Sequence, residues 1–304
     1  MSTRINTNTT AFEAARNLSI NSDNVSKNIQ RLSSGLRINS ASDDAAGLVI
    51  SESLRAQSAG LTQATRNTND AINVVKTAEG ALNEVHSLLI NIRQLVVHAA
   101  NVGANDATAS QADKDAVASA VASIDRIAGT TQFNHKNLLD GSADSATPAS
   151  AGPPAVAAGQ DLTFQIGANA GQTVSLKITD SRSTNIGTVG ANKLSALAAG
   201  GSLDLSDTTG ASQQSALAVV DKAIADISAT REKLGSTQSN VLETNVRSLS
   251  VSQQNTDASE STIRDTDLSA EIVNFTKNQI LVQAGTSALA QANQAPQAIL
   301  KLLQ

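Results

Sequence analysis

Apolar residues near the start of the chain recur at alternating steps of four and three. The series runs through Ala11, Ala15, Leu18, Ser22, Val25, Ile29, Leu32 and Leu36, and Ser22 is its one polar member. Such spacing places the series on one side of an α-helix and is typical of a coiled-coil seam. It predicts an amphipathic helix, with Gly35 weakening its end.

A longer seam follows, and every position in it is apolar. It comprises Ala71, Val75, Ala78, Leu82, Val85, Leu89, Ile92, Val96 and Ala99. This pattern predicts a long helix. We expect the larger members of the seam to form the core of a helical bundle, namely Val75, Leu82, Val85, Leu89, Ile92 and Val96.

Two further helix boundaries can be predicted in this half of the chain. Ser40 and Asp43 match a capping box, so a helix should begin near Ser40. A third helix is predicted over residues 110–129, because Val117, Val121, Ile124 and Ile127 share one side of it and Gly129 ends it.

The helical pattern returns near Ser212. It runs through Val220, Ile224, Ile227, Leu234 and Val241, and the apolar stripe then slips by one residue to Leu242, Leu249 and Ile263. We interpret this slip as the drift of an α-helix against a strict heptad. In the last helix Leu268, Phe275, Val282 and Leu289 recur at steps of seven, and Pro296 is expected to kink or end it.

The segment between these helical parts has a different composition, rich in Gly, Ala, Ser, Pro and Thr. Residues 162–166 and 173–178 alternate on both sides of a loop that contains Gly and Asn, which predicts a β-hairpin. The remainder, to about residue 205, is expected to be loop and turn. The predicted fold is therefore mainly α: a long antiparallel helical coiled-coil bundle with its N- and C-terminal segments paired, plus a small β-hairpin region in the middle.

The composition favours thin helical bundles and excludes several kinds of core and site. The 304 residues include four Phe and no Tyr, Trp or Cys, so a large aromatic core, a disulfide and a thiolate metal site are excluded. A net charge of −5 without a run of basic residues gives no support for binding nucleic acid or a membrane surface. There is no apolar segment typical of a cleaved signal or a membrane span, so general rules predict a cytoplasmic protein.

The terminal helices need partners. Leu18, Val25, Ile29, Leu32 and Leu36 could each contribute about 1.5–3 kcal/mol if they were buried. An isolated helix is marginal in water, so we expect the two terminal helices to pair and to bundle with those of other copies. They should be disordered in a free monomer. Phe12 and Phe275, one on each terminal helix, are either seam residues or contacts between the termini or between neighbouring copies.

Catalytic chemistry finds no support in the sequence. His86, His98 and His135 do not share metal-ligand spacing, and Asp43 and Asp44 are explained by helix capping. There is no Walker loop, nucleophile elbow or zinc-protease motif. We predict no enzymatic activity, no cofactor and no metal.

Motifs at both ends resemble those of bacterial flagellins. They are residues 5–8, 31–39, 42–48, 68–72, 78–82, 132–134, 164–169, 279–281, 284–287 and 290–294. The resemblance covers residues 1–140 and 205–304 and the hairpin. It implies a structural subunit that self-assembles into the flagellar filament for swimming motility. Hypotheses left open are a hook–filament junction protein with similar ends, made in few copies, and a secreted coiled-coil adhesin or effector.

The resemblance also implies domains and partners. Residues 1–42 with 264–304 would form an inner-tube coiled-coil domain, and residues 43–140 with 205–263 a rod-like helical domain. Residues 141–204 would be a short insert with its hairpin packed on the rod domain, without a large outer domain. The implied partners are further copies in a helical homopolymer, an export chaperone, the filament cap and the hook-junction proteins. Export through the flagellar type III apparatus, without a cleaved signal, would place the protein outside the cell and replaces the cytoplasmic prediction.

One segment departs from the pattern of flagellins that activate the animal Toll-like receptor for flagellin. Such flagellins commonly carry Gln-Arg-x-Arg-Glu-Leu on the first rod-domain helix. Here Arg93 and Leu95 match this pattern, whereas Asn91 and Gln94 do not. The departure predicts weakened recognition by that receptor, with Arg93 and Leu95 as the contact residues that the resemblance implies.

Overall fold

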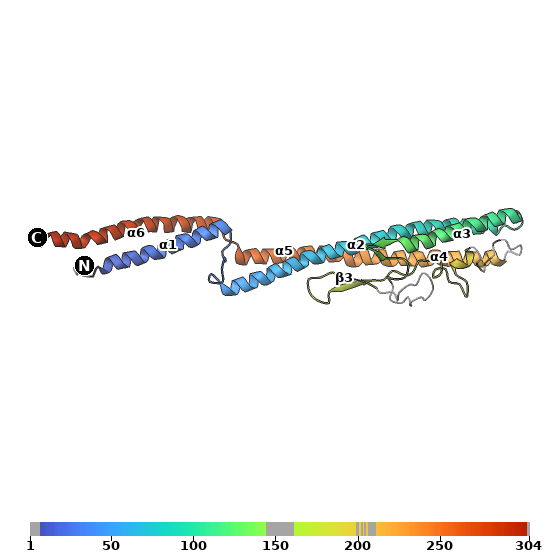
Figure 1. Ribbon diagram of the computed structural model, residues 1–304, viewed down its shortest axis with the longest axis horizontal. Coiled ribbons are helices and arrows are strands. Elements are labelled where there is room, and N and C mark those ends of the chain that lie inside the picture. The colour runs from blue at the N-terminus through green and yellow to red at the C-terminus, as the bar shows by residue number, and fades with distance from the viewer. Residues whose placement is uncertain are drawn as a thin grey trace. The chain divides into compact units, whose positions relative to one another are not determined.

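The fold is mainly α-helical, as predicted. The computed structural model describes residues 7–143, 161–198, 201, 203, 205 and 211–302, with side chains as far as Gln294. The helices are α1 (Thr9–Ser34), α2 (Ala45–Ala99), α3 (Ala107–Thr130), α4 (Ala211–Ser236), α5 (Thr244–Arg264) and α6 (Leu268–Leu302) (Figure 1). A short 3-10 helix, η1 (Leu194–Leu197), and a π-helical segment, η2 (Thr237–Glu243), complete the helical elements.

The chain forms two compact units. The terminal unit comprises Met1–Ala59 and Gln253–Gln304, and the central unit comprises Gly60–Ser252. These boundaries differ from the predicted ones at residues 42/43 and 263/264. Side-chain bonds explain the difference, because Ser58 binds Asp257 at 2.5 Å and Arg264 binds Glu52 at 2.8 Å. The first turns of α2 and the end of α5 are thereby tied to each other inside the terminal unit.

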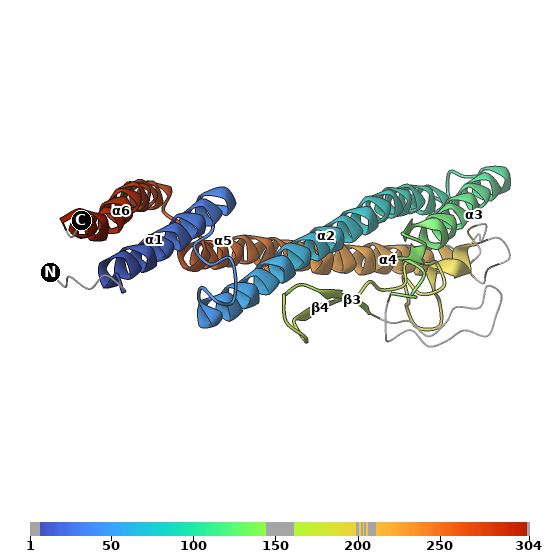
Figure 2. The same cartoon turned by 60° about the vertical axis from the view of Figure 1, so that its left-hand side comes forward.

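In the terminal unit α1 and α6 run antiparallel, side by side (Figures 1 and 2). Asn8 Nδ2 donates to the carbonyl of Ala292 at 2.8 Å near one end, and Asn278 Nδ2 lies 3.4 Å from Asn28 Oδ1 farther along. The predicted pairing of the terminal helices is therefore confirmed. Helix α1 ends where Gly35 adopts a left-handed backbone with φ of 72°, as its position predicted.

Helix α2 begins later than predicted. Its first residue is Ala45, and Asp44 caps it by accepting the backbone N–H of Gly47 at 2.8 Å. Asp43 instead closes the preceding loop. Its carboxylate accepts from the backbone N–H and the hydroxyl of Ser40 and from the N–H of Asn39, and these bonds lower the pKa of Asp43. The predicted capping box at Ser40 was therefore wrong. Asp43 forms hydrogen bonds within the loop, and Asp44 is the residue that caps the helix.

The core of the central unit lies between α2, α3 and α4. All nine residues of the long α2 seam are buried, each at most 1% exposed. They pack with Val117, Val121 and Ile124 of α3, as predicted for that helix, and with residues of α4 such as Val220 and Ile227. Helix α3 is observed three residues earlier than expected, because Asp106 caps it by accepting from the N–H of Ala109.

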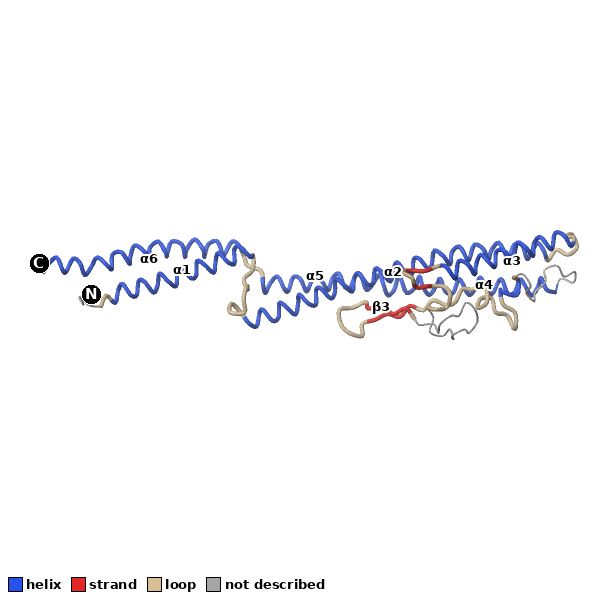
Figure 3. Tube along the Cα trace, viewed as in Figure 1, coloured by secondary structure: helices blue, strands red, loops and turns tan. Residues whose placement is uncertain are grey.

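Two small hairpins complete the central unit (Figure 3). Strands β3 (Leu162–Gln165) and β4 (Thr173–Leu176) pair antiparallel with Leu162 opposite Leu176, which confirms the predicted hairpin. Strands β1 (Gln132–Phe133) and β2 (Lys136–Asn137) form a second, unpredicted pair, joined by Asn134 and His135 with positive φ. Residues 144–160 and most of 199–210, where loop was predicted, lie outside the described residues.

Two details of the C-terminal helices differ from expectation. The slip of the apolar stripe before Leu242 is not gradual drift, because the helix is π-helical from Thr237 to Glu243. In addition, Pro296 does not end α6, which continues to Leu302. Proline removes only one backbone donor, and a helix can continue past it when its neighbours keep their own hydrogen bonds.

Candidate functional site

The terminal unit has almost no apolar core of its own. Among its described side chains, Ile38 is the single hydrophobic one that is buried. Its large hydrophobic residues are instead exposed at Phe12, Ile20, Ile29, Val49, Ile50, Leu268, Ile272, Val273, Ile280 and Leu281. Phe12 and Val49 are both 71% exposed. A soluble domain rarely exposes so many large apolar side chains, and such surfaces mark interaction sites.

The face of α1 that packs against α6 differs in part from the predicted seam. Leu18, Val25 and Leu32 are half-buried in this face. Ile29 is 50% exposed, and Asn28, at 6% exposure, occupies the inward position instead. The residues of α1 that face inward are 11, 14, 18, 21, 25, 28 and 32. Every second position of the predicted series is therefore replaced by the residue just before it. The prediction placed Ile29 inward because Ile is more hydrophobic than Asn. Hydrophobicity at one position does not determine which side of a helix faces its partner.

The remaining predicted seam residues are placed as follows. Leu36 lies beyond the end of α1, in a backbone bridge with Asp265. On α6, Phe275, Val282 and Leu289 are half-buried toward α1, whereas Leu268, at the first turn, is 52% exposed. The pair therefore alternates large apolar residues with small or polar ones such as Asn28 and Asn278.

A groove lies between α1 and α6 on one side of the pair. The α6 side of its lining is apolar or small, and the α1 side mixes Ala14 and Ile20 with polar residues. The lining comprises Thr10, Glu13, Ala14, Asn17, Ile20, Asn21, Leu281, Ala284, Gly285 and Ala288. Gly285 of α6 faces Leu18 of α1, since a Cβ at this position would lie at van der Waals distance, 3.4 Å, from Leu18 Cδ1. The terminal pair thus combines exposed ridges with a groove of similar chemistry, which suits packing against another helix.

The core positions predicted for the central unit are fully buried. Val75, Leu82, Val85, Leu89, Ile92 and Val96 are each 0% exposed and belong to one continuous apolar cluster. Burial of each such side chain contributes about 1.5–3 kcal/mol to stability. The central unit can therefore fold on its own core, whereas the described side chains of the terminal unit form no comparable cluster.

Arg93 and Leu95 lie on the same segment of α2 in different environments. Arg93 is half exposed, and its Nε donates to Asp221 Oδ1 of α4 at 2.7 Å. Leu95 is partly buried and packs against the apolar cluster. Arg93 is thus available at the surface, while Leu95 has a structural role in the core.

Two asparagines hold the β3–β4 hairpin, and the sequence analysis did not identify them. Asn67 Nδ2 of α2 donates to the carbonyl of Gln165 at 3.1 Å. Asn245 Nδ2 of α5 donates to the carbonyl of Ile166 at 2.7 Å and lies 3.3 Å from Thr68 Oγ1. Both stand among other polar residues on helical surfaces, so no sequence pattern indicates that they in particular reach a distant strand.

Replacing Asn245 with Ala should release the turn of this hairpin. The carbonyl of Ile166 would lose its donor, and because this acceptor is partly buried the cost should be at most about 1–3 kcal/mol. We expect faster amide hydrogen exchange across residues 167–172, with the helices unchanged. Asn255→Ala on the same helix is the control, since that side chain is exposed. Equal exchange in both variants would contradict this role.

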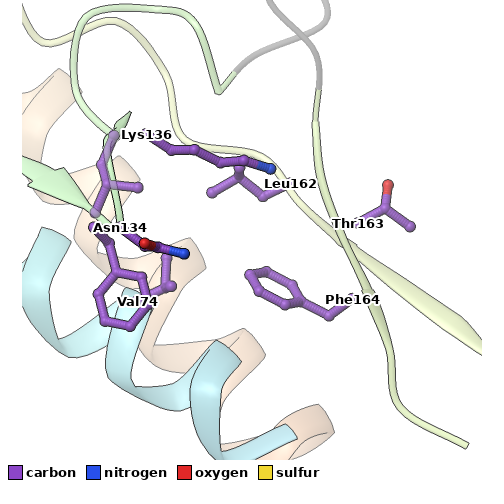
Figure 4. Close-up of a pocket in the computed structure, with 8 residues that line it drawn as sticks. Val74, Asn134, Lys136, Leu162, Thr163 and Phe164 are labelled. Carbon is purple, nitrogen blue, oxygen red and sulfur yellow. The ribbon is translucent and has the colours of Figure 1, made fainter. Parts of the chain in front are cut away.

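A small cavity lies between the two hairpins (Figure 4). Val74 and Leu138 contribute to its lining, together with Phe133, Asn134 and Lys136 from the first hairpin and Leu162, Thr163 and Phe164 from the second. The ring of Phe164 points into it (Figure 4). Its volume of about 180 Å³ is small compared with ligand pockets, which measure about 300–1,000 Å³.

The buried charges of the central unit have structural partners. Asp180 forms an ion pair with Arg182 at 2.6 Å, and the hydrogen bond from Arg182 raises the pKa of that guanidinium. Asp125 of α3 accepts from the backbone N–H and hydroxyl of Ser183, both at 2.7 Å. These bonds anchor the loop around residues 180–187 to the helices and present no group poised for catalysis.

The candidate chemistry of the histidines is equally limited. His98 Nδ1 lies 2.6 Å from Asp113 Oδ2, where α2 and α3 meet at their connecting turn. Within the described residues, no three His, Cys, Asp or Glu side chains gather as metal ligands. No helix in the described part of the chain is long and apolar enough to cross a membrane.

Known proteins resemble this chain over nearly its whole length. Two family models match the chain, the bacterial flagellin N-terminal helical region over residues 5–144 and the C-terminal helical region over residues 217–303. A flagellin from Bacillus subtilis is 45% identical over 312 residues, covering 99% of this chain and 100% of that protein. The flagellar filament 33 kDa core protein of Treponema phagedenis is 41% identical and covers 99% of each chain. A crystal structure of Bacillus cereus flagellin, 28% identical, covers 60% of this chain and 88% of its own with a TM-score of 0.46. This chain belongs to the bacterial flagellin family.

Proposed function

We propose that this chain is the structural subunit of a bacterial flagellar filament, which polymerises through its terminal unit. The observation that carries the proposal is the contrast between the two units. The central unit buries a continuous apolar core, whereas among the described side chains of the terminal unit Ile38 is buried and the other large apolar ones are half-buried or exposed. Family membership supports the same function, with a role in swimming motility and no enzymatic activity.

The energetics favour assembly. Two helices that alternate large residues with Asn, Ala and Gly bury little apolar area, and an isolated pair of this kind is marginal in water. Each exposed Ile, Leu, Val or Phe could yield about 1.5–3 kcal/mol when a neighbouring copy covers it. The terminal helices therefore become ordered as the polymer grows, and order in the free monomer is limited.

The finer organisation is also part of the proposal. Residues 1–42 with 264–304 form the inner-tube coiled-coil domain, and residues 43–140 with 205–263 form the rod-like helical domain. Residues 141–204 are a short insert, and a large outer domain is absent. The full-length similarity to proteins named as flagellins and filament core proteins supports a filament subunit over a hook–filament junction protein or a coiled-coil adhesin.

The proposed location is the extracellular filament. Export through the flagellar type III apparatus would require no cleaved signal. An export chaperone, the filament cap and the hook-junction proteins are the proposed partners besides other copies of the chain. No nucleic acid, membrane insertion or cofactor has a part in this function.

Electron microscopy of the purified protein tests the proposal directly. The protein is first depolymerised and then concentrated with seed fragments of its own filaments. We expect long filaments of uniform diameter, growing from the seeds. Persistent monomers or short oligomers under conditions in which the central unit is folded would reject a filament-forming subunit and favour the junction hypothesis.

Phe12→Ala should weaken the filament without affecting the monomer. Phe12 is 71% exposed, so its ring gains burial only from a neighbouring copy. Loss of a contact of about 2–3 kcal/mol per subunit should lower the filament melting temperature measurably. Calorimetry of filaments and of monomers checks this result. Phe275→Ala is the comparison, since Phe275 is half-buried against α1 and its loss should also weaken the helix pair.

Recognition by the Toll-like receptor for flagellin should be weak. Arg93 is half exposed and engaged with Asp221, and Asn91 and Gln94 depart from the activating pattern. In a cell reporter assay with monomeric protein, the double variant Asn91→Arg, Gln94→Glu should increase potency. Potency of the unmodified protein equal to that of a strongly stimulating flagellin would disprove the weakened recognition.

A further inference from the structure

The helical run from Ala211 to Arg264 changes its phase at one place. Ile227 and Leu234 are buried seven residues apart, and Leu242 and Leu249 are buried seven residues apart as well. Eight residues separate Leu234 from Leu242, so the helix contains one residue more than a repeat of seven allows. The side chain at the regular position, Val241, is 38% exposed, whereas Leu242 is 1% exposed.

The surplus residue is accommodated in the π-helical segment Thr237–Glu243. A π-helix joins residues five apart, and two side-chain bonds here have that same spacing. Gln238 Nε2 donates to Glu243 Oε1 at 3.0 Å, and Thr244 Oγ1 donates to the carbonyl of Ser239 at 3.3 Å. These bonds favour a π-helical turn in this segment over a π-helical turn elsewhere in the same helix.

The phase change has a direct effect on the hairpin. Asn245, two residues after the π-helical segment, binds the carbonyl of Ile166 and reaches Thr68 on α2. In an α-helix each residue turns by about 100°, so residues seven apart lie on nearly the same side. If the helix continued from Leu234 without the phase change, Val241 and Ser248 would point inward in place of Leu242 and Leu249. Asn245 would then be rotated away from the hairpin by the same angle.

We propose that Thr237–Glu243 is a phase adaptor. It lets one continuous helix bury Ile227 and Leu234 in the apolar cluster, then bury Leu242 and Leu249, and aim Asn245 at the β3–β4 hairpin. The π-helical turn absorbs one extra residue, so that the helix on both sides keeps the phase it needs, and the chemical identity of that residue is secondary. Hairpin attachment therefore depends on this preserved phase and not only on the asparagine that makes the contact.

Single-residue deletions in the full chain test the proposal. Deletion of Ser239 removes the surplus and should convert the segment to α-helix while both flanks keep their phase. We expect a melting temperature within a few degrees of the parent and amide exchange across residues 167–172 within about twofold. The matched deletion of Ala225, an exposed residue of α4, rotates Ile227 and Leu234 out of the core. It should lower the melting temperature by more than about 10 °C.

Cysteine labelling shows directly which side chains of the helix face inward, without a measurement of stability. The chain has no native cysteine, so only the introduced one reacts. Val241→Cys should react at least tenfold faster than Leu242→Cys with a thiol reagent, both in the parent and in the Ser239 deletion. The proposal is overturned if deletion of Ser239 reverses this order or releases the hairpin. It is equally overturned if the two deletions destabilise the protein to the same extent.

Discussion

Leu89→Ala should cost the central unit about 2–5 kcal/mol of unfolding free energy, because it leaves a cavity in a core that cannot collapse around it. Leu89 is 0% exposed at the middle of the α2 seam, and residues of α3 and α4 pack in the same cluster. Those helices are held by many other contacts, so they cannot close the space that the missing methyl groups leave. Urea unfolding of the monomer, followed by circular dichroism, measures the loss.

The neighbouring residue supplies the control for this prediction. Ile90 is 43% exposed on the same helix, so Ile90→Ala should change the unfolding free energy by about 0.5 kcal/mol or less. A similar loss in both variants would mean that the α2 seam is not the core of the central unit. Filament formation by Ile90→Ala can be examined in parallel, because its fold should be intact.

The double variant Leu18→Cys, Gly285→Cys should form a disulfide that locks the terminal helices together. A Cβ built on Gly285 lies 3.7 Å from the Cβ of Leu18, within the range of about 3.5–4.5 Å that disulfides require. The closed loop spans most of the chain, so the bond should stabilise the paired state by about 5 kcal/mol in the chain-entropy model. Because the chain has no cysteine, no competing disulfide can form within the monomer.

Mobility on a non-reducing gel shows whether the bond forms, and helix content with and without reductant shows its effect on the termini. Oxidation should be carried out in assembled filaments, in which the terminal helices are ordered, and the gel separates cross-links between copies by their size. Helix content is then measured on the dissociated monomer. Ile29→Cys with Gly285→Cys is the mismatched control, since Ile29 is exposed about three turns away along α1. Equal oxidation of both pairs would show that the register of α1 and α6 is not fixed in the assembled subunit.

The sequence was most informative where apolar periodicity was unbroken. The α2 seam contains an apolar residue at every expected position, and burial followed it from Ala71 to Ala99. The hairpin was equally predictable, because alternation on both sides of a Gly-containing loop has few other solutions. In α1 the series contained Ser22 and two Ala, so two phases were nearly equivalent. The contact with α6 selected the phase that buries Asn28 and exposes Ile29.

Other features depend on interactions that a linear pattern does not contain. Asp43 and Asp44 are adjacent carboxylates, and only the loop geometry determines which of them caps α2. The slip before Leu242 was visible in the sequence, but a drift and a local π-helix give the same apolar pattern over so few residues. Asn67 and Asn245 act on a hairpin far away in the sequence, so the helical pattern around them contains no sign of that contact.

The near absence of a core in the terminal unit has a consequence under mass action. Ile38 alone buries too little apolar surface to hold these helices in place, so neighbouring copies must bury the rest. The helices then become ordered only when the subunit joins the polymer, and a single equilibrium constant describes both events. The subunit concentration at which growth begins is then a direct measure of the stability of the terminal unit. A substitution that weakens the contact by about 1.4 kcal/mol should raise this critical concentration tenfold. Below it, the chain consists of a folded central unit with two unpartnered ends, and above it, further subunits enter the polymer while the free concentration stays constant.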